Sequence, residues 1–300
     1  SGESAPPLTA WLWAAALAAL AVAAFFHAAG KLAIPQSQAF LAFNHERVGA
    51  FASADPPDAL RIVLLGNSRL KYGTLSEAEL GTLAAELGYR PMRFLRLVNN
   101  WAVFEDFAAL ESVLLAARPD VVVMQIDLLA QERAEPARAL LLREYAEWLM
   151  VGRGPWNPGD LDQAELQFGT PCAHEAGPNA LEERRRRVGR WLRVEPDGAG
   201  ARLAGAFVSR AAAEGIAVVL LRVPRTSTME SAMGEADENI LATASRVMAA
   251  YPGIRLLAPA GPPDQLYCDL VHLDAAGRRA FSTRLVAALP TLSRASRAAP

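Results

Sequence analysis

The sequence predicts an α/β protein, a three-layer α/β/α sandwich around a parallel sheet of about five strands, preceded by one transmembrane helix. Two observations predict this fold. Short, continuously apolar runs alternate with helical stretches, which is typical of strands covered on both faces and joined by right-handed βαβ units. A longer apolar run without charge precedes them. The formal net charge of −2 over 300 residues gives no electrostatic argument for a nucleic-acid partner.

The long apolar run covers residues 8–30 and contains no Asp, Glu, Lys or Arg. About 20 apolar residues at roughly 1.5 Å rise cross a hydrocarbon core, and Trp11 and Trp13 suit a membrane interface. We therefore interpret residues 1–31 as a membrane anchor. A signal peptide, whose apolar region is about 7–15 residues long, and a buried soluble helix are the alternatives. Lys31, taken literally, favours a cytoplasmic C-terminal side.

Residues 32–58 predict a stalk helix that ends before Pro56 and Pro57, and residues 59–300 predict one compact domain. The predicted strands are 61–66, 92–98, 120–126, 216–223 and 254–259, and the predicted helices are 76–88, 104–117, 129–150, 203–215 and 238–251. Residues 152–199 break this alternation. We interpret them as an insertion beside the carboxyl edge of the sheet, where ligand-binding loops gather in this class.

The insertion contains a run of four arginines, Arg184 to Arg187. It predicts a solvated helix face, with binding of anionic lipid or glycan as the alternative. Two cysteines, Cys172 and Cys268, are too few for a metal cluster or a disulfide-built scaffold, and we expect neither a metal nor a cofactor. One disulfide between them and two unrelated thiols both remain open.

Ser68 follows the first predicted strand directly, so it should lie at the edge of the sheet where ligands bind. Gly66, Asn67 and Ser68 are also ordinary turn residues, and a serine needs a base to become nucleophilic near neutral pH. Three histidines are poor candidates for that base, because His27 lies in the apolar run, His45 in the stalk and His174 in the insertion.

The fourth histidine, His272, stands three residues after Asp269 in "DLVHLDAAGRRAF", just before a helix opened by Asp274. A short loop of this spacing can place both side chains on one side. The carboxylate would then hold one ring nitrogen while the other faces a serine. The alternative is a helix N-cap beside a solvated histidine.

Together, "LLGNSR" and "DLVHLDAAGRRAF" resemble the first and last blocks of the SGNH (GDSL-like) hydrolase family, in order over most of residues 60–290. The resemblance implies a flavodoxin-like sandwich and a catalytic triad of Ser68, Asp269 and His272. It also implies an oxyanion hole that joins the Ser68 backbone N–H to donors from two middle blocks.

The middle blocks differ from the family pattern. "LVNNWAVFEDF" offers Asn99 and Asn100 but no Gly, and "PDVVVMQIDLL" has Asp127 where Gly-x-Asn-Asp is expected. An ionised Asp cannot donate a hydrogen bond. We therefore expect Asn99 or Asn100 to supply the second donor for the oxyanion.

The anchor, the stalk, the "GNSR" block and the degenerate third block resemble the membrane-tethered SGNH proteins of polysaccharide O-acetylation and wall acylation. This resemblance implies a single-pass protein of the inner membrane with a periplasmic catalytic domain. It also implies a polysaccharide acceptor and a multispan membrane-bound O-acyltransferase as the partner that delivers the acyl group.

We therefore predict O-acetyl transfer to an extracytoplasmic polysaccharide through an acyl-Ser68 intermediate. A membrane-anchored carbohydrate or lipid esterase with the same triad is the first alternative. The second is a non-catalytic glycan-binding or scaffold subunit of an acyltransferase complex.

Further candidates for substrate binding lie near the predicted site: Arg69, Asp127, Arg222, Arg225 and Trp101. Arg69 adjoins the serine, and the other two arginines leave the fourth predicted strand at the same edge of the sheet. Trp101 and Trp156 can stack on the face of a sugar ring. Backbone bracing for Arg222 and Arg225, and core packing for the tryptophans, are the alternatives.

Overall fold

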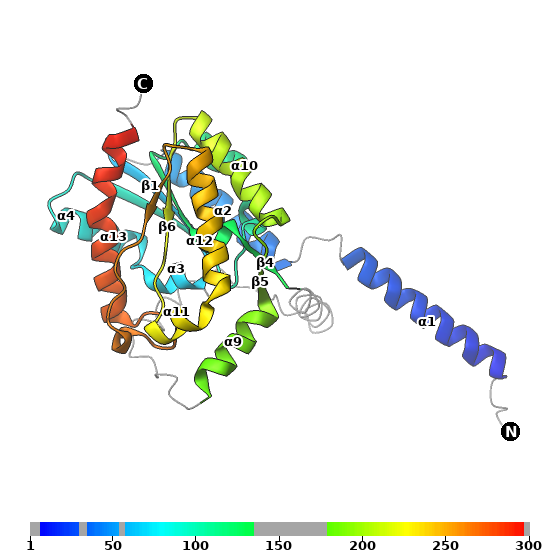
Figure 1. The fold of residues 1–300 in the computed structure, drawn as a ribbon. Coiled ribbons are helices and arrows are strands. Elements are labelled where there is room, and N and C mark those ends of the chain that lie inside the picture. The colour runs from blue at the N-terminus through cyan, green and yellow to red at the C-terminus, as the bar shows by residue number, and fades with distance from the viewer. Residues whose placement is uncertain (1–6, 30–34, 54–57, 135–178, 297–300) are drawn as a thin grey trace.

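The computed structural model describes residues 7–29, 35–53, 58–134 and 179–296. Within these ranges one five-stranded parallel sheet has the order β2-β1-β3-β6-β7 (Figure 1). Its strands are β1 (Leu60–Gly66), β2 (Met92–Val98), β3 (Val121–Gln125), β6 (Ala217–Leu221) and β7 (Arg255–Leu257). The strand order reverses between β1 and β3, which is where open α/β sheets bind ligands.

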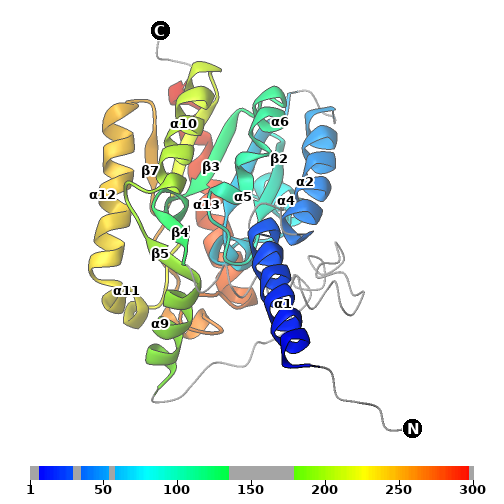
Figure 2. The same ribbon diagram turned by 90° about the vertical axis from the view of Figure 1, so that its right-hand side faces the viewer.

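Helices cover both faces of this sheet (Figure 2). In β1, Leu60, Ile62 and Leu64 face one side and Val63 and Leu65 the other, because successive strand side chains point to opposite faces. One face packs on α3 (Ser68–Gly73), α4 (Glu77–Glu86) and α13 (Ala275–Ser296). The other packs on α2 (Pro35–Ser53), α5 (Glu105–Ala108), α6 (Glu111–Ala116), α10 (Ala199–Ala213) and α12 (Glu235–Ala250). The predicted three-layer sandwich is confirmed.

Helix α2 is not the stalk that we expected. Phe40, Val48 and Phe51 of α2 are buried in the core, and α2 packs against β2 and α6. Arg47 pairs with Glu77 at the start of α4. The globular unit therefore includes α2 and begins before the expected boundary at residue 59. The periodicity of the sequence identifies an apolar helix face but not the surface that this face covers.

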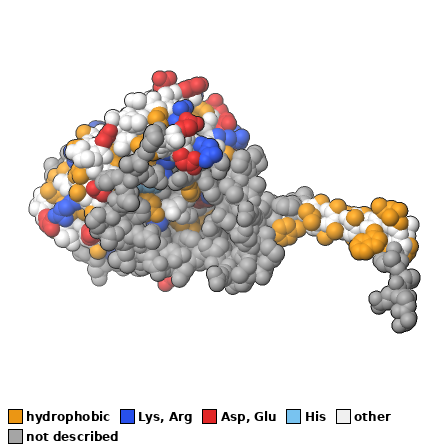
Figure 3. Space-filling view, turned by 90° about the horizontal axis from the view of Figure 1, so that it is seen from below, with side chains coloured by type: hydrophobic (Ala, Val, Ile, Leu, Met, Phe, Trp, Pro, Cys, Tyr) orange, Lys and Arg blue, Asp and Glu red, His pale blue; other side chains and the backbone are white. Residues whose placement is uncertain are grey.

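Helix α1 (Leu8–Ala29) projects from the sandwich as an isolated rod with an apolar surface (Figures 1 and 3). Residues Leu8–Phe25 have a mean hydropathy of 2.0, and none of them is buried. Trp11, Trp13 and Leu17 are all more than half exposed. This helix has the length and composition of a membrane anchor or of a signal sequence.

The chain after β3 departs from the predicted pattern. Residues 104–117 form two short helices instead of one. We expected a helix to start at residue 129. A 3₁₀ turn, Ile126–Leu129, ends there instead, and β4 (Gln131–Arg133) follows. Strand β4 pairs antiparallel with β5 (Leu192–Val194), which directly follows α9 (Ala180–Trp191). Residues 135–178, with Trp156, Cys172 and His174, lie outside the described residues.

Candidate active site

Ser68 stands at the first turn of α3, immediately beyond the end of β1. Asn67 caps this helix, and its Oδ1 accepts a hydrogen bond from the Arg69 backbone N–H at 3.0 Å. The turn from strand to helix is tight. A Cβ at Gly66 would lie 2.5 Å from the Leu70 side chain, so only glycine fits before the cap. This local geometry carries Ser68 to the carboxyl edge of the sheet.

The turn before Ser68 is held by two buried side chains of the neighbouring segment: an amide at the end of β3 and a carboxylate just beyond that strand. Gln125 accepts a hydrogen bond from the Asn67 backbone N–H at 3.0 Å and donates to Asn67 Oδ1, also at 3.0 Å. The same Gln125 amide donates to Asp127 Oδ2 at 2.8 Å. The ends of β1 and β3 are thus joined by side chains, and the position of Ser68 is fixed relative to Asp127.

The Asp-x-x-His spacing folds as a closed loop between the 3₁₀ turn Asp264–Leu266 and α13. Thr226, the N-cap of α11 (Ser227–Met233), donates its backbone N–H to the Leu270 carbonyl of this loop. Asp269 Oδ1 accepts hydrogen bonds from the backbone N–H groups of Val271 and His272, at 2.8 and 2.7 Å. The Cys268 backbone N–H donates to the His272 carbonyl at 2.8 Å. Asp274 then opens α13 by accepting from the Gly277 N–H at 2.7 Å, as predicted.

The loop brings the three predicted catalytic side chains into one chain of contacts. His272 Nε2 lies 3.0 Å from Ser68 Oγ, and His272 Nδ1 lies 2.8 Å from Asp269 Oδ2. Burial acts to raise the pKa of Asp269, but hydrogen bonds and charge from His272, Arg184 and the loop outweigh it and hold this pKa well below its ordinary value. The carboxylate is therefore ionised at any pH at which an imidazole is a base.

Arg184 contradicts the expectation of a solvated helix face for the arginine run. It is 5% exposed, and its Nη2 lies 3.0 Å from Asp269 Oδ2 and 3.3 Å from His272 Nδ1. Arg185 and Arg186 on the same helix are exposed, as expected. The sequence offered no signal for this contact, because it depends on how β4 and β5 dock α9 over the carboxyl edge.

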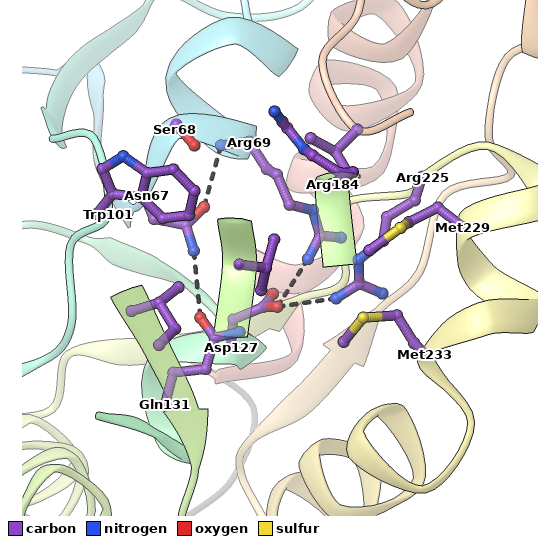
Figure 4. Close-up of a pocket in the computed structure, with 13 residues that line it drawn as sticks. Asn67, Ser68, Arg69, Trp101, Asp127, Gln131, Arg184, Arg225, Met229 and Met233 are labelled. Atoms are coloured by element: carbon purple, nitrogen blue, oxygen red, sulfur yellow. Dashed lines mark hydrogen bonds and ion pairs between the residues drawn. The ribbon is translucent and has the colours of Figure 1, made fainter. Parts of the chain in front are cut away.

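A pocket of about 40 Å³ opens beside Ser68 (Figure 4). Trp101, Met229 and Met233 supply apolar walls. The Trp101 backbone is in the left-handed region, with φ of 55°, a conformation that costs energy for a non-glycine residue and is found mainly at functional sites. Of the expected substrate-binding residues, four line this pocket: Arg69, Asp127, Arg225 and Trp101.

Two arginines share the Asp127 carboxylate at the floor of the pocket. Arg69 Nη1 lies 2.7 Å and Arg225 Nη2 3.0 Å from Asp127 Oδ1. Burial acts to raise the pKa of Asp127, but the two guanidinium groups outweigh it and lower this pKa below its ordinary value. Asp127 is thus an ionised acceptor that fixes two cations.

Three other candidates do not line the pocket. Arg222 instead pairs with Glu230 and Asp237, at 2.8 and 2.7 Å. The Asn99 Oδ1 accepts a hydrogen bond from the Asn100 backbone N–H at 2.8 Å. The Asn100 side chain bonds to Tyr72. Neither asparagine lines the pocket beside Ser68, and their role as the second oxyanion donor stays a prediction.

Tyr72 is a residue of the site for which the sequence analysis proposed no role. It is 8% exposed, and its ring meets that of His272 edge to face, with centroids 5.1 Å apart and an interplanar angle of 83°. Tyr72 lies one helical turn after Ser68, so a signal existed: residues four apart share a face of a helix. Through this contact the ring of Tyr72 orients the imidazole.

Cys268, which precedes Asp269, is disulfide-bonded. The other cysteine of the sequence, Cys172, lies outside the described residues. No group of three or more His, Cys, Asp or Glu side chains among the described residues is arranged to hold a metal ion. What the described side chains can do is remove a proton from Ser68 and receive a small oxygen-bearing group beside it.

Comparisons with known proteins find no matching family model and no matching curated protein. Among solved structures, the chain is similar to a lipase/acylhydrolase from Enterococcus faecalis, with a TM-score of 0.42 and 15% identity over 78% of this chain and 95% of that one. It is also similar to a GDSL-like lipase from Bacteroides thetaiotaomicron VPI-5482, with a TM-score of 0.41 and 13% identity over 83% of this chain and 98% of that one. At these values, the likeness says nothing about what the chain binds or acts on.

Proposed function

We propose that the chain is a serine-dependent O-acyltransferase of the SGNH type, anchored by α1 and acetylating an extracytoplasmic polysaccharide. The observation that carries the proposal is the chain of contacts from Ser68 Oγ through His272 to Asp269, at 3.0 and 2.8 Å. Nucleophile, base and orienting carboxylate stand at hydrogen-bond distance and in the order that acyl transfer requires. A scaffold subunit would have no need of this geometry.

The reaction proceeds in two halves. Ser68 Oγ attacks the carbonyl carbon of the donor while His272 Nε2 takes the serine proton, and the carbonyl electron pair moves onto oxygen. Collapse of this tetrahedral intermediate expels the donor alcohol, which takes the proton from His272 and leaves acyl-Ser68. A sugar hydroxyl then attacks the acyl-serine by the same route, giving the new ester and free Ser68. Asp269 stays ionised and stabilises the imidazolium in both halves.

The size of the pocket supports a short acyl group. It measures about 40 Å³ on a scale on which one water-sized sphere needs roughly 10–15 Å³. An acetyl group suits this space, whereas a long acyl chain would have to leave it. The tether provided by α1 suits a donor delivered through the membrane, and the partner we propose is a multispan membrane-bound O-acyltransferase.

An esterase with the same three residues is the second candidate, because water can replace the sugar hydroxyl in the second half-reaction. The test uses the full chain in detergent with a chromogenic acetyl ester and a panel of glycan oligomers, with products followed by mass spectrometry. Ser68→Ala is the inactive variant. Ser231→Ala, an exposed serine on α11 whose Oγ bonds only to the Ser227 carbonyl, is the matched control.

Acetylated oligomers that appear with wild type and Ser231→Ala, and vanish with Ser68→Ala, support the transferase. Release of acetate alone, with the same dependence on Ser68, replaces the transferase with the esterase. Absence of both products would contradict catalysis and move the proposal to a scaffold. We expect Ser68→Ala to lower the rate at least about 10⁴-fold, as loss of the nucleophile does in a serine protease.

A further inference from the structure

Arg69 lines the pocket beside Ser68 with hydrogen-bond donors to spare. Its side chain is 8% exposed, and one nitrogen, Nη1, is held by Asp127. Within the described part of the chain, its Nε and Nη2 atoms are buried without any hydrogen-bond partner. A buried donor without an acceptor destabilises the fold, and such groups in native proteins point to a missing acceptor.

The positive and negative charges around Arg69 are equal in number, and this limits what kind of acceptor can bind its unpaired nitrogens. The ion-pair cluster that begins at the floor of the pocket and extends beyond it contains three guanidinium groups and three carboxylates among the described residues: Arg69, Arg222, Arg225, Asp127, Glu230 and Asp237. No cationic charge is left over to hold a permanent anion. The cluster instead suits a neutral oxygen that becomes negative only during the reaction, such as the carbonyl oxygen of an ester.

The residue that gives this oxygen its second hydrogen bond has still to be assigned. The Ser68 backbone N–H has no acceptor among the described residues and can serve as the first. Asn99 and Asn100 do not line the pocket, and Asp127 is ionised, so it only accepts. In Figure 4 the Arg69 guanidinium lies between Ser68 and Arg225. Arg69 adjoins Ser68 in the chain, lines the pocket and has two buried nitrogens without a partner in the described part of the chain, so it is our candidate for the second donor.

We propose that Arg69 is a catalytic residue whose guanidinium donates the second hydrogen bond to the oxyanion of the tetrahedral intermediate. The role rests on the serine chemistry proposed above. Asp127 acts in it as a positioning residue, because it holds the guanidinium at the floor of the pocket. No proton moves from Arg69: the carbonyl electron pair shifts onto oxygen, and an N–H group of Arg69 donates to it.

The protonation state of Arg69 agrees with this role. Burial, followed by the charge of Arg225, lowers the pKa of Arg69 to about 10. The guanidinium thus remains protonated at pH 7 to 8, where an imidazole base is active. It is a charged donor in a site from which water is largely excluded, and charged donors make hydrogen bonds roughly twice as strong as neutral ones.

The test compares an acetyl ester with its thionoester, in which sulfur replaces the carbonyl oxygen, using the full chain in detergent. Sulfur accepts hydrogen bonds poorly, so the ratio of the two rates measures how strongly the protein holds the oxyanion. We expect Arg69→Met to cleave the oxygen ester about 100- to 1000-fold more slowly. The oxygen-to-sulfur rate ratio should fall at least about tenfold, because the thionoester gains less from the lost donor.

Arg222→Met is the matched control, because it removes a guanidinium from the same ion-pair cluster without touching the pocket. Its rate ratio should equal that of wild type. Arg69→Lys keeps a cation beside Asp127 in case the methionine variant does not fold. The lysine variant should also show a lowered ratio, because an ammonium group lacks the reach and the fork of a guanidinium.

The outcomes separate this role from the proposed function. A folded Arg69 variant that keeps the wild-type rate ratio overturns the role of Arg69 and leaves the serine chemistry intact. A wild-type protein that cleaves neither ester refutes the serine chemistry, and the role of Arg69 with it. If the oxygen-to-sulfur rate ratio falls equally in Arg222→Met, the ion-pair cluster only supports the shape of the site. That result also overturns the role of Arg69 as an oxyanion donor.

Discussion

Replacing Asp269 by asparagine should abolish catalysis through the histidine tautomer, without disturbing the fold. Asp269 Oδ1 accepts from two backbone N–H groups, those of Val271 and His272. An asparagine must keep its own oxygen there, because its amide nitrogen would otherwise face two donors. The amide nitrogen is thereby forced into the position of Oδ2, 2.8 Å from His272 Nδ1 and 3.0 Å from Arg184 Nη2, which loses its acceptor there.

This position fixes the wrong tautomer. The amide nitrogen donates to Nδ1, so the ring proton moves to Nε2, which then points its N–H at Ser68 Oγ and cannot remove the serine proton. The same substitution in a serine protease of unrelated fold lowers kcat about 10⁴-fold. We expect a loss of this size, about 5 kcal/mol of transition-state stabilisation.

The assay is steady-state cleavage of a chromogenic acetyl ester, with thermal unfolding measured in parallel. Asp274→Asn is the matched control. Asp274 Oδ1 caps α13 by accepting from the Gly277 N–H, and asparagine caps a helix about as well as aspartate. Its activity should stay within about twofold of wild type, because the cap is preserved. An Asp269→Asn protein with more than a tenth of the wild-type kcat would refute the tautomer argument.

Three further predictions concern the surroundings of the triad. Asp127→Ala leaves the buried guanidinium of Arg69 without its carboxylate, whereas Arg225 keeps Glu230 and Asp237; the loss should destabilise the fold by about 3–5 kcal/mol in urea unfolding. Because the pKa of Asp127 is depressed in the folded state, its contribution is complete above the unfolded value of 3.8 and is lost as the pH falls through the folded value. The difference in unfolding free energy between Asp127→Ala and wild type should therefore shrink as the pH falls below the folded-state pKa of Asp127. A difference that stays constant with pH would contradict this linkage. Tyr72→Leu should lower kcat up to about tenfold by removing the edge-to-face contact with His272, whereas Tyr72→Phe should retain most of it; equal losses would show that the phenol, not the ring, matters. Reduction of the disulfide at Cys268 should loosen the loop in which the Cys268 N–H donates to the His272 carbonyl, and so slow ester cleavage. Alkylation and mass spectrometry confirm the free thiol. Unchanged activity of a fully reduced protein would show that the loop keeps its structure without the disulfide.

Spacing and residue type alone were enough to predict the sheet and the Asp-x-x-His loop. The apolar runs around residues 61–66 and 120–126 predict strands buried on both faces, because alternate side chains must all find cover. The Asp-x-x-His loop is equally local: its aspartate bonds backbone groups only two and three residues away. Features that depend on neighbours in the chain can be predicted from spacing and residue type.

Which distant side chains meet at the site could not be predicted from the sequence and is seen only in the folded chain. Arg184 reaches Asp269 because β4 and β5 pair across the insertion, and the four-arginine run looks the same in sequence whether or not one member is buried. Arg69, and not Asn99 or Asn100, lines the pocket, and Asp127, just beyond the end of β3, holds its guanidinium. Helix α2 would have an apolar face both as a stalk and as part of the globular unit, but only the packing shows that this face lies against the sheet. Periodicity tells which side of an element is buried, whereas the partner is set by docking between elements far apart in the chain.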